Sequence, residues 1–173
     1  MKLLEILQGK WLGHPLHPAI VHVPIGLWTV ACLLDVIVWF FPDWIVLARL
    51  SQYAVLVGVL AALLAVPTGA ADWASVKPEK PAWKIALVHL LLNLVATVLW
   101  AVNFGLRLIQ PEGAQPISLG VLLTSIGGTL FVFAGGYLGA LLVFDHGIGV
   151  ARFSKKKWRA IAERGGSRVP EDT

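Results

Sequence analysis

Residues 13–24 read GHPLHPAIVHVP and lie directly ahead of a long apolar run. His14 and His17 each precede a proline, which disfavours the helical conformation at both histidines. Pro18 can serve as the first residue of a helix, where its missing N–H group costs nothing, and His22 then falls about one turn inside that helix. The stretch therefore predicts that a helix begins near Pro18 and that three imidazoles gather where water gives way to lipid.

The composition indicates a membrane protein. Of the 173 residues, 57% are hydrophobic and only 14% are charged, and apolar stretches of about 20 residues are the signature of membrane-spanning helices. Four such stretches, joined by short connections, cover residues 18–41, 44–71, 82–109 and 117–144. We therefore expect an all-α integral membrane protein with an antiparallel four-helix bundle over residues 18–147.

The two ends of the chain differ from this apolar centre. Residues 1–17 place leucines and a tryptophan at helical spacing opposite polar side chains, and residues 148–173 mix aromatic side chains with lysine and arginine. Both patterns predict short interfacial helices that lie on the membrane surface. The single cysteine, Cys32, leaves no disulfide framework and no motif for covalent haem attachment.

The positive charges predict the orientation. Of the 14 lysines and arginines, only Arg49 and Arg107 fall outside the side that holds both termini and the loop over residues 75–81. Since cytoplasmic loops carry an excess of these residues, we expect both termini in the cytoplasm. We assign the basic residues to topology and not to nucleic-acid binding. The chain also lacks a phosphate loop after a strand, a nucleophile elbow and an H-E-x-x-H motif.

The antiparallel topology brings the histidines to one end of the bundle. The first and third spans start on the side of the membrane where the second and fourth spans end. His89, near the start of the third span, therefore lies close to the N-terminal histidines. Asp72 and His146, at the ends of the second and fourth spans, lie at the same end of the bundle. Polar side chains at membrane depth are costly and usually functional. The pattern predicts a bound metal or haem at this end.

In the leading interpretation, the site holds b-type haem, or a related redox metal, and passes electrons at the membrane. His22 and His89 are the expected axial ligands, because they lie on different helices at comparable depth. Other side chains would contact the haem propionates or transfer protons, namely His14, His17, His146 and Lys84.

Two alternatives remain open. A non-haem site for iron, copper or zinc would use His14, His17, His22 and His146 as ligands, with Asp72 orienting them. A cofactor-free accessory subunit of a larger membrane complex would use the histidines only for hydrogen bonds, and its glycine-rich fourth helix would be a docking face.

Further polar and small residues lie inside the spans. His89, Asn93, Thr97 and Trp100 share one face of the third helix, and for Asn93 and Thr97 we expect interhelical hydrogen bonds. The fourth helix carries six glycines, including one G-x-x-x-G step. Such glycines allow either close helix packing or room for a flat macrocycle.

An acidic residue, Asp35, lies deep in the first span, where an unpaired carboxylate is costly. The chain turns at about residues 42–43, so Arg49 reaches a similar depth on the second span and is the expected partner. Arg107, near the outer end of the third span, is the competing partner.

Four segments resemble a bacterial family of small four-helix membrane proteins, domain-of-unknown-function family 2231. They are the opening GHPLHPAIVHVPIGLW, the GAADW that ends the second span, HLLLN in the third, and the closing GGYLGALLVFDHGIGV. The resemblance covers Gly13 to Val150 and implies a bacterial inner membrane. It also implies that the family's signature positions are His14, His17, His22, Asp72, His89, Asn93, His146 and Gly147.

Members of that family occur joined to Rieske iron–sulphur or c-type cytochrome domains, which implies electron transfer. We find no such appended domain in this sequence. The resemblance therefore implies a separate redox protein, or a larger membrane complex, as the partner.

Overall fold

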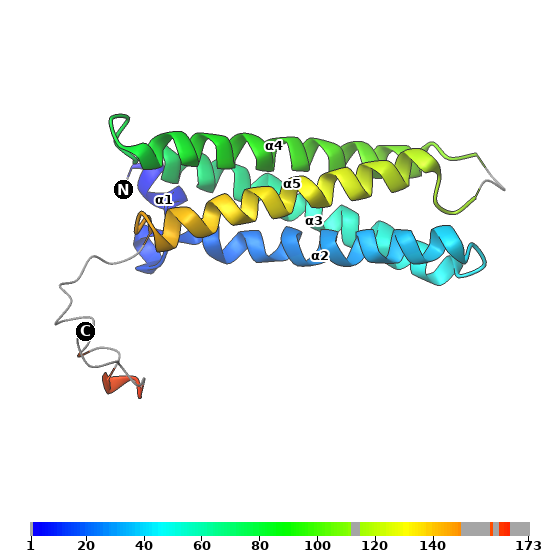
Figure 1. Ribbon diagram of the computed structural model, residues 1–173, viewed down its shortest axis with the longest axis horizontal. Helices are drawn as coiled ribbons and strands as arrows, with labels where there is room; N and C mark the ends of the chain where they lie inside the picture. Colours follow the sequence, from blue (N-terminus) through cyan, green and yellow to red (C-terminus); the bar gives the residue numbers. More distant parts are fainter. Residues whose placement is uncertain (1, 112–114, 150–159, 161–162, 167–173) are drawn as a thin grey trace.

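The computed structural model describes residues 2–111, 115–149, 160 and 163–166. Within them the chain forms four long helices and two short ones at its start (Figure 1). The elements in chain order are α1 (Leu3–Leu7), the 3₁₀ helix η1 (Lys10–Leu12), α2 (Leu16–Phe40), α3 (Ile45–Trp73), α4 (Pro81–Leu108) and α5 (Leu119–Phe144). All four long helices are of a length and apolar composition that can cross a membrane. They pack antiparallel, so the predicted all-α bundle is confirmed.

The first long helix starts earlier than the sequence predicts. Pro15 is extended, with φ −64° and ψ 130°, and α2 begins at Leu16. His17 is therefore helical, and the extended conformation expected of it ahead of Pro18 is wrong. The first turn of a helix leaves its N–H groups unpaired, so Pro18 is accommodated there without losing a hydrogen bond.

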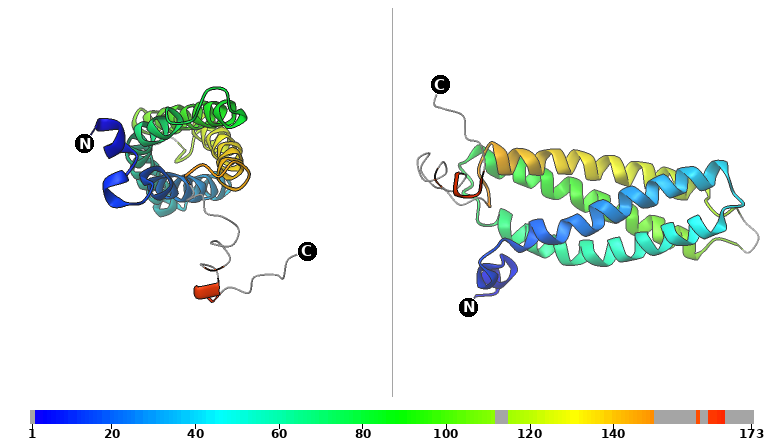
Figure 2. Two further views of the ribbon diagram at one scale, coloured as in Figure 1. Left: turned by 90° about the vertical axis from the view of Figure 1, so that its left-hand side faces the viewer. Right: turned by 90° about the horizontal axis from the view of Figure 1, so that it is seen from below.

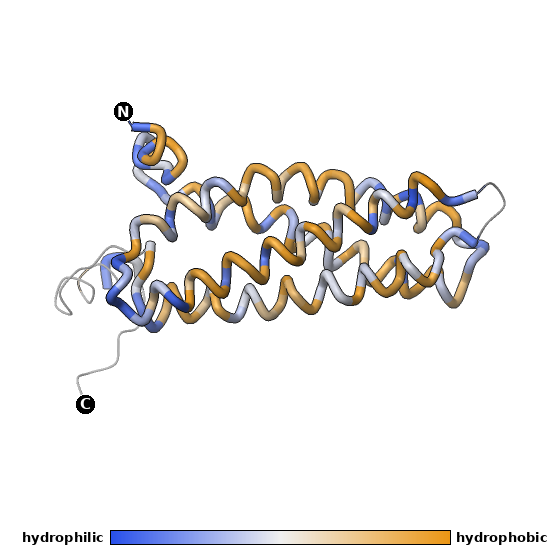
Figure 3. Tube along the Cα trace, turned by 90° about the horizontal axis from the view of Figure 1, so that it is seen from above, coloured by the Kyte–Doolittle hydropathy of each residue, from blue (hydrophilic) through white to orange (hydrophobic). Residues whose placement is uncertain are grey.

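The four helices surround a common axis as two hairpins. Helix α2 packs mainly on α3, and α4 mainly on α5, whereas α3 with α4 and α2 with α5 pack less closely. In the end-on view of Figure 2 the helices form a ring, with α2 diagonally opposite α4. Many large apolar side chains of the long helices are exposed, such as Leu60 on α3 and Phe133 on α5. Figure 3 shows that hydrophobic residues extend along the whole length of the bundle. This outward apolar surface is typical of a multi-pass membrane protein.

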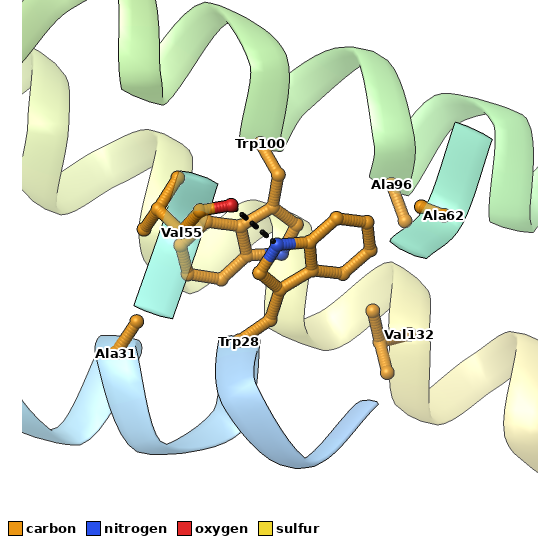
Figure 4. Packing of buried hydrophobic residues seen from close by; sticks show 7 residues of the cluster. All are labelled: Trp28, Ala31, Val55, Ala62, Ala96, Trp100 and Val132. Atoms are coloured by element: carbon orange, nitrogen blue, oxygen red, sulfur yellow. Dashed lines mark hydrogen bonds between the residues drawn. The ribbon is translucent and has the colours of Figure 1, made fainter. Parts of the chain in front are cut away.

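Two tryptophans meet at the centre of the bundle (Figure 4). The rings of Trp28 on α2 and Trp100 on α4 stack with centroids 5.6 Å apart and an interplanar angle of 11°. The indole N–H of Trp28 donates to the backbone oxygen of Val55 at 3.5 Å. Two indoles fill most of the space between the four helices, so the side chains around them are small. These side chains are Ala31, Ala62, Ala96 and Val132.

Glycines make room for these indoles. A Cβ atom built on Gly128 of α5 would lie 2.6 Å from Nε1 of Trp100, and a Cβ atom built on Gly58 of α3 would likewise overlap the indole of Trp28.

We expect Gly128→Ala to lower the free energy of unfolding by about 1–3 kcal/mol, the usual cost of overpacking a core. Equilibrium unfolding in detergent measures this loss. The matched control is Gly105→Ala, whose Cβ meets nothing within 4 Å and which should be neutral or stabilise its helix by up to about 1 kcal/mol. Equal effects of the two changes would contradict the packing role.

A buried polar cluster lies towards the end of the bundle at which α2 ends. Asp35 is 0% exposed and pairs with Arg107 of α4, with 2.5 Å between Nη2 and Oδ2. The expected Asp35–Arg49 pair is wrong, because Arg49 is exposed on the outward face of α3. The carboxylate also accepts hydrogen bonds from Ser51 at 2.6 Å and from Ser125 at 2.5 Å.

The N-terminal segment docks against α3. Gln8 donates from its side-chain amide to the backbone oxygen of Ala71 at 3.0 Å and to the hydroxyl of Ser75. The segment lies at the end of the bundle where α2 begins (Figure 1). The predicted interfacial helix over residues 148–173 falls mostly outside the described residues.

Candidate histidine site at one end of the bundle

A cavity of about 940 Å³ lies inside the end of the bundle at which α2 and α4 begin. All four long helices line it, and Trp28, Thr97 and Val132 line the part nearest the bundle centre. Cofactor pockets usually measure about 300–1,000 Å³. The polar side chains predicted from the sequence that line this cavity are His17, His22, Asp72, His89, Asn93 and His146.

Two histidines face each other across this cavity. The rings of His17 on α2 and His89 on α4 lie with centroids 6.2 Å apart and planes at 88°. Both side chains are half-buried. Similar depth on two helices predicted His22 as the partner of His89, but the ring that faces His89 is that of His17.

Backbone carbonyl groups hold both rings in one tautomer. Nδ1 of His17 lies 3.1 Å from the backbone oxygen of Ala65, and Nδ1 of His89 lies 2.8 Å from that of Gly135. A carbonyl oxygen only accepts, so Nδ1 carries the proton of each neutral ring. Nε2 then keeps its lone pair in both histidines, as in metal-binding histidines oriented by a backbone carbonyl.

Glycines let the imidazoles lie close to the neighbouring helices. A Cβ atom on Gly69 of α3 would lie 2.7 Å from Cε1 of His17, and one on Gly139 of α5 would lie 3.1 Å from Cε1 of His89. Close helix packing and room for a macrocycle were the two explanations expected for the glycines of α5. The structure adds the room that Gly139 makes for an imidazole of the adjacent helix.

The expected interhelical hydrogen bonds of Asn93 and Thr97 are wrong. Asn93 donates to the backbone oxygen of His89 at 2.8 Å, and Thr97 donates to that of Asn93 at 2.8 Å, so both bonds stay within α4. Both side chains nevertheless line the cavity. A Cβ atom on Gly135 would lie 2.6 Å from Nδ2 of Asn93, so this amide packs directly on the backbone of α5.

The other predicted residues are spread around the cavity and its surroundings. His22 is exposed, whereas Asp72 and His146 are half-buried. His14 and Lys84 are exposed and do not line the cavity. Within the part of the chain that the structure describes, no three His, Cys, Asp or Glu side chains come together as a metal-binding group.

The facing pairs reveal an internal repeat. His17 and His89, Trp28 and Trp100, and Asp35 and Arg107 are each 72 residues apart. On the partner helices, Gly58 and Gly128 contact the indoles, and the carbonyls of Ala65 and Gly135 bond the imidazoles, each pair 70 residues apart. The hairpin α2–α3 and the hairpin α4–α5 are therefore related by an approximate two-fold axis along the bundle.

The sequence carries a signal for this repeat that depth along the helices does not reveal. In α2, His17 is followed by Trp28 after 11 residues and by Asp35 after seven more. In α4, His89 is followed at the same spacing by Trp100 and Arg107. The pattern selects His17, and not His22, as the counterpart of His89.

The comparisons with known proteins agree with this architecture. No curated protein and no solved structure matches the chain. A family model described as "Predicted membrane protein (DUF2231)" matches residues 13–152, which include all four long helices. Because that model covers most of the sequence and the four helices have the length and composition of membrane spans, the chain belongs to the DUF2231 family of predicted membrane proteins.

Proposed function

We propose that this protein binds b-type haem between His17 and His89 and transfers electrons within the membrane. The observation that carries the proposal is the separation of the two rings. One metal bound by a nitrogen of each ring, at the usual distance of about 2 Å, would require the two ring centres to lie about 6 Å apart. The measured distance between the ring centroids is 6.2 Å.

The symmetry of the site supports the same ligand. The histidines come from helices related by the approximate two-fold axis, so both would hold such a group through equivalent imidazoles. Residues of α3 and α5 would surround a macrocycle bound in this way. The residues of those helices that line the cavity include the small Ala62, Ala65, Gly69 and Gly139.

The surrounding residues have defined roles in this proposal. A bound haem supplies one iron that takes up and releases single electrons. Ala65 and Gly135 hold the two imidazoles with Nε2 unprotonated. Lys77, Lys80 and His146 line the same cavity and would hold the propionates. Lys84, expected in that role, does not line the cavity.

The orientation and partners extend the proposal. The chain is a multi-pass membrane protein, and we place it in a bacterial inner membrane with both termini in the cytoplasm. Lys2, Lys10, Lys77 and Lys80 lie at the histidine end of the bundle, whereas Arg49 and Arg107 lie towards the other end. This distribution supports a cytoplasmic histidine end. The electron donor and acceptor are then separate molecules or subunits of a larger complex.

An absorption spectrum tests the proposal. Protein purified from cells grown with a haem precursor should show a Soret band and, after reduction by dithionite, the sharp α band of a low-spin haem. The pyridine haemochrome assay should identify haem b at about one per chain. Iron, copper or zinc without a Soret band would replace haem by a non-haem metal. Protein with neither haem nor metal would favour the cofactor-free accessory subunit.

A further inference from the structure

The histidine cavity continues through the side of the bundle. His17 and His22 are five residues apart, so their side chains leave α2 in directions that differ by about 140°. His17 faces His89 inside the ring, whereas His22 is exposed, and yet both line the same cavity. The cavity must therefore pass the edge of α2 and reach the outer surface.

The opening lies between α2 and α5. Ile25 of α2 lines the cavity together with Gly136 and Val143 of α5, and both α5 residues are exposed. Of the four neighbouring helix pairs, α2 and α5 pack least closely. In the right-hand view of Figure 2 these two helices diverge towards the end at which α2 begins.

An opening between two membrane-spanning helices is entered from the lipid. Helix α2 has 25 residues and is about 38 Å long, compared with about 30 Å for the hydrocarbon core of a bilayer. A centred α2 therefore puts His22, about 9 Å from Leu16, just inside the edge of that core. No hydrogen bond joins the His22 ring to any other described residue. A polar group exposed at that depth is costly unless a ligand or water pairs with it. The occupant that fits is lipid-soluble and brings a hydrogen-bonding group to His22.

We propose that this opening, formed by His22, Ile25, Gly136 and Val143, binds the head group of an isoprenoid quinol. The proposal rests on the haem function above, because a ligand beside a redox centre in this position is suited to exchange electrons with it. His22 accepts a hydrogen bond and then the proton from a quinol hydroxyl. Oxidation to the quinone releases two protons and two electrons in total. A bound haem would supply one-electron chemistry, so the first electron must pass to the separate acceptor of the proposed function before the second follows. His22 takes the protons and releases them to the aqueous end of the bundle.

Quinol-driven reduction of the haem-loaded protein in lipid nanodiscs tests this site. A short-chain ubiquinol or menaquinol should reduce the wild-type haem, followed at the α band. His22→Ala should slow this reduction by about a hundredfold, the lower end of the effect of a positioned proton acceptor. The control is His14→Ala, which changes an exposed histidine outside the cavity and should reduce at the wild-type rate. Dithionite should reduce all the proteins fully.

A second pair of variants blocks the opening without removing a polar group. A Cβ atom on Gly136 meets nothing within 4 Å, so Gly136→Leu should fold, fill the opening and slow quinol reduction by a similar factor. Gly26→Leu is its match on α2, since Gly26 also meets nothing within 4 Å and does not line the cavity. Equal rates for Gly136→Leu and Gly26→Leu, or an undiminished rate in His22→Ala, would overturn the quinol site.

Binding to the haem-free protein separates this inference from the haem proposal. An azido-quinone should crosslink to residues around the opening, and unlabelled quinone should compete whereas a saturated acyl chain of equal length should not. Crosslinking by the azido-quinone should be lost in Gly136→Leu and kept in Gly26→Leu. This result would support the quinol site even if the protein shows no Soret band and binds no haem. Competition by the acyl chain alone would show a lipid groove and refute the proposal.

Discussion

His17→Ala and His89→Ala are each expected to abolish the low-spin haem spectrum while the protein still inserts into the membrane. Each change removes one of the two rings that face each other at 6.2 Å, and no other described histidine contacts either ring. Loss of a residue that merely orients a ligand already costs about 10–100-fold in metal affinity, so loss of the ligand itself should cost at least as much. The measurement is the ratio of Soret to protein absorbance after purification.

The matched controls are the other N-terminal histidines. His14→Ala and His22→Ala should keep the Soret and α bands, because these side chains are exposed and neither contacts His89 in the described structure. His89→Met gives a second readout, since a thioether ligand should retain haem and raise its reduction potential. A normal low-spin spectrum in both His17→Ala and His89→Ala would exclude this axial pair.

Asp35→Asn and Arg107→Gln are expected to destabilise the bundle by about 3–5 kcal/mol each, the usual result of removing one partner of a buried ion pair. The cost arises because the remaining partner is left without its counter-ion in a low dielectric. Asp35 is 0% exposed and the Arg107 side chain 4% exposed, so water does not reach either group. Equilibrium unfolding from mixed micelles measures the free energies.

The double variant sharpens this test. Asp35→Asn combined with Arg107→Gln should cost less than the sum of the single changes, because neither charge is then unpaired. Arg49→Gln is the control: its side chain is exposed, and the change should stay within about 0.5 kcal/mol. Strict additivity of the two buried changes, or a large loss for Arg49→Gln, would contradict the observed pairing.

The buried ion pair also explains how two similar hairpins assemble in one arrangement. Asp35 and Arg107 are equivalent under the approximate two-fold axis, and so are His17 and His89 and the two stacked tryptophans. Two copies of either hairpin would place like charges against each other at this position, which is strongly unfavourable when buried. The opposite charges therefore favour the association of α2–α3 with α4–α5.

Much of the architecture could be read from the sequence. The length and apolarity of the four runs predicted the helices to within about two residues at each end, because a membrane span requires about 20 apolar residues. Short connections made the helices antiparallel and so brought the histidines of the first and third spans to one end. Depth along the bundle follows from residue number alone, at about 1.5 Å per residue.

The rotation of each helix about its own axis was decided only by the tertiary structure. Similar depth predicted that His22 pairs with His89, but the ring that faces His89 is that of His17. It also predicted that Arg49 pairs with Asp35, but the partner of Asp35 is Arg107. Each residue turns a helix by about 100°, so side chains at similar depth can face the bundle interior or the lipid. Which direction is inward depends on the packing of all four helices, here on the tryptophan stack and on the glycines opposite the rings. Sequence therefore determined the spans and their order, and packing determined which side chains meet inside them.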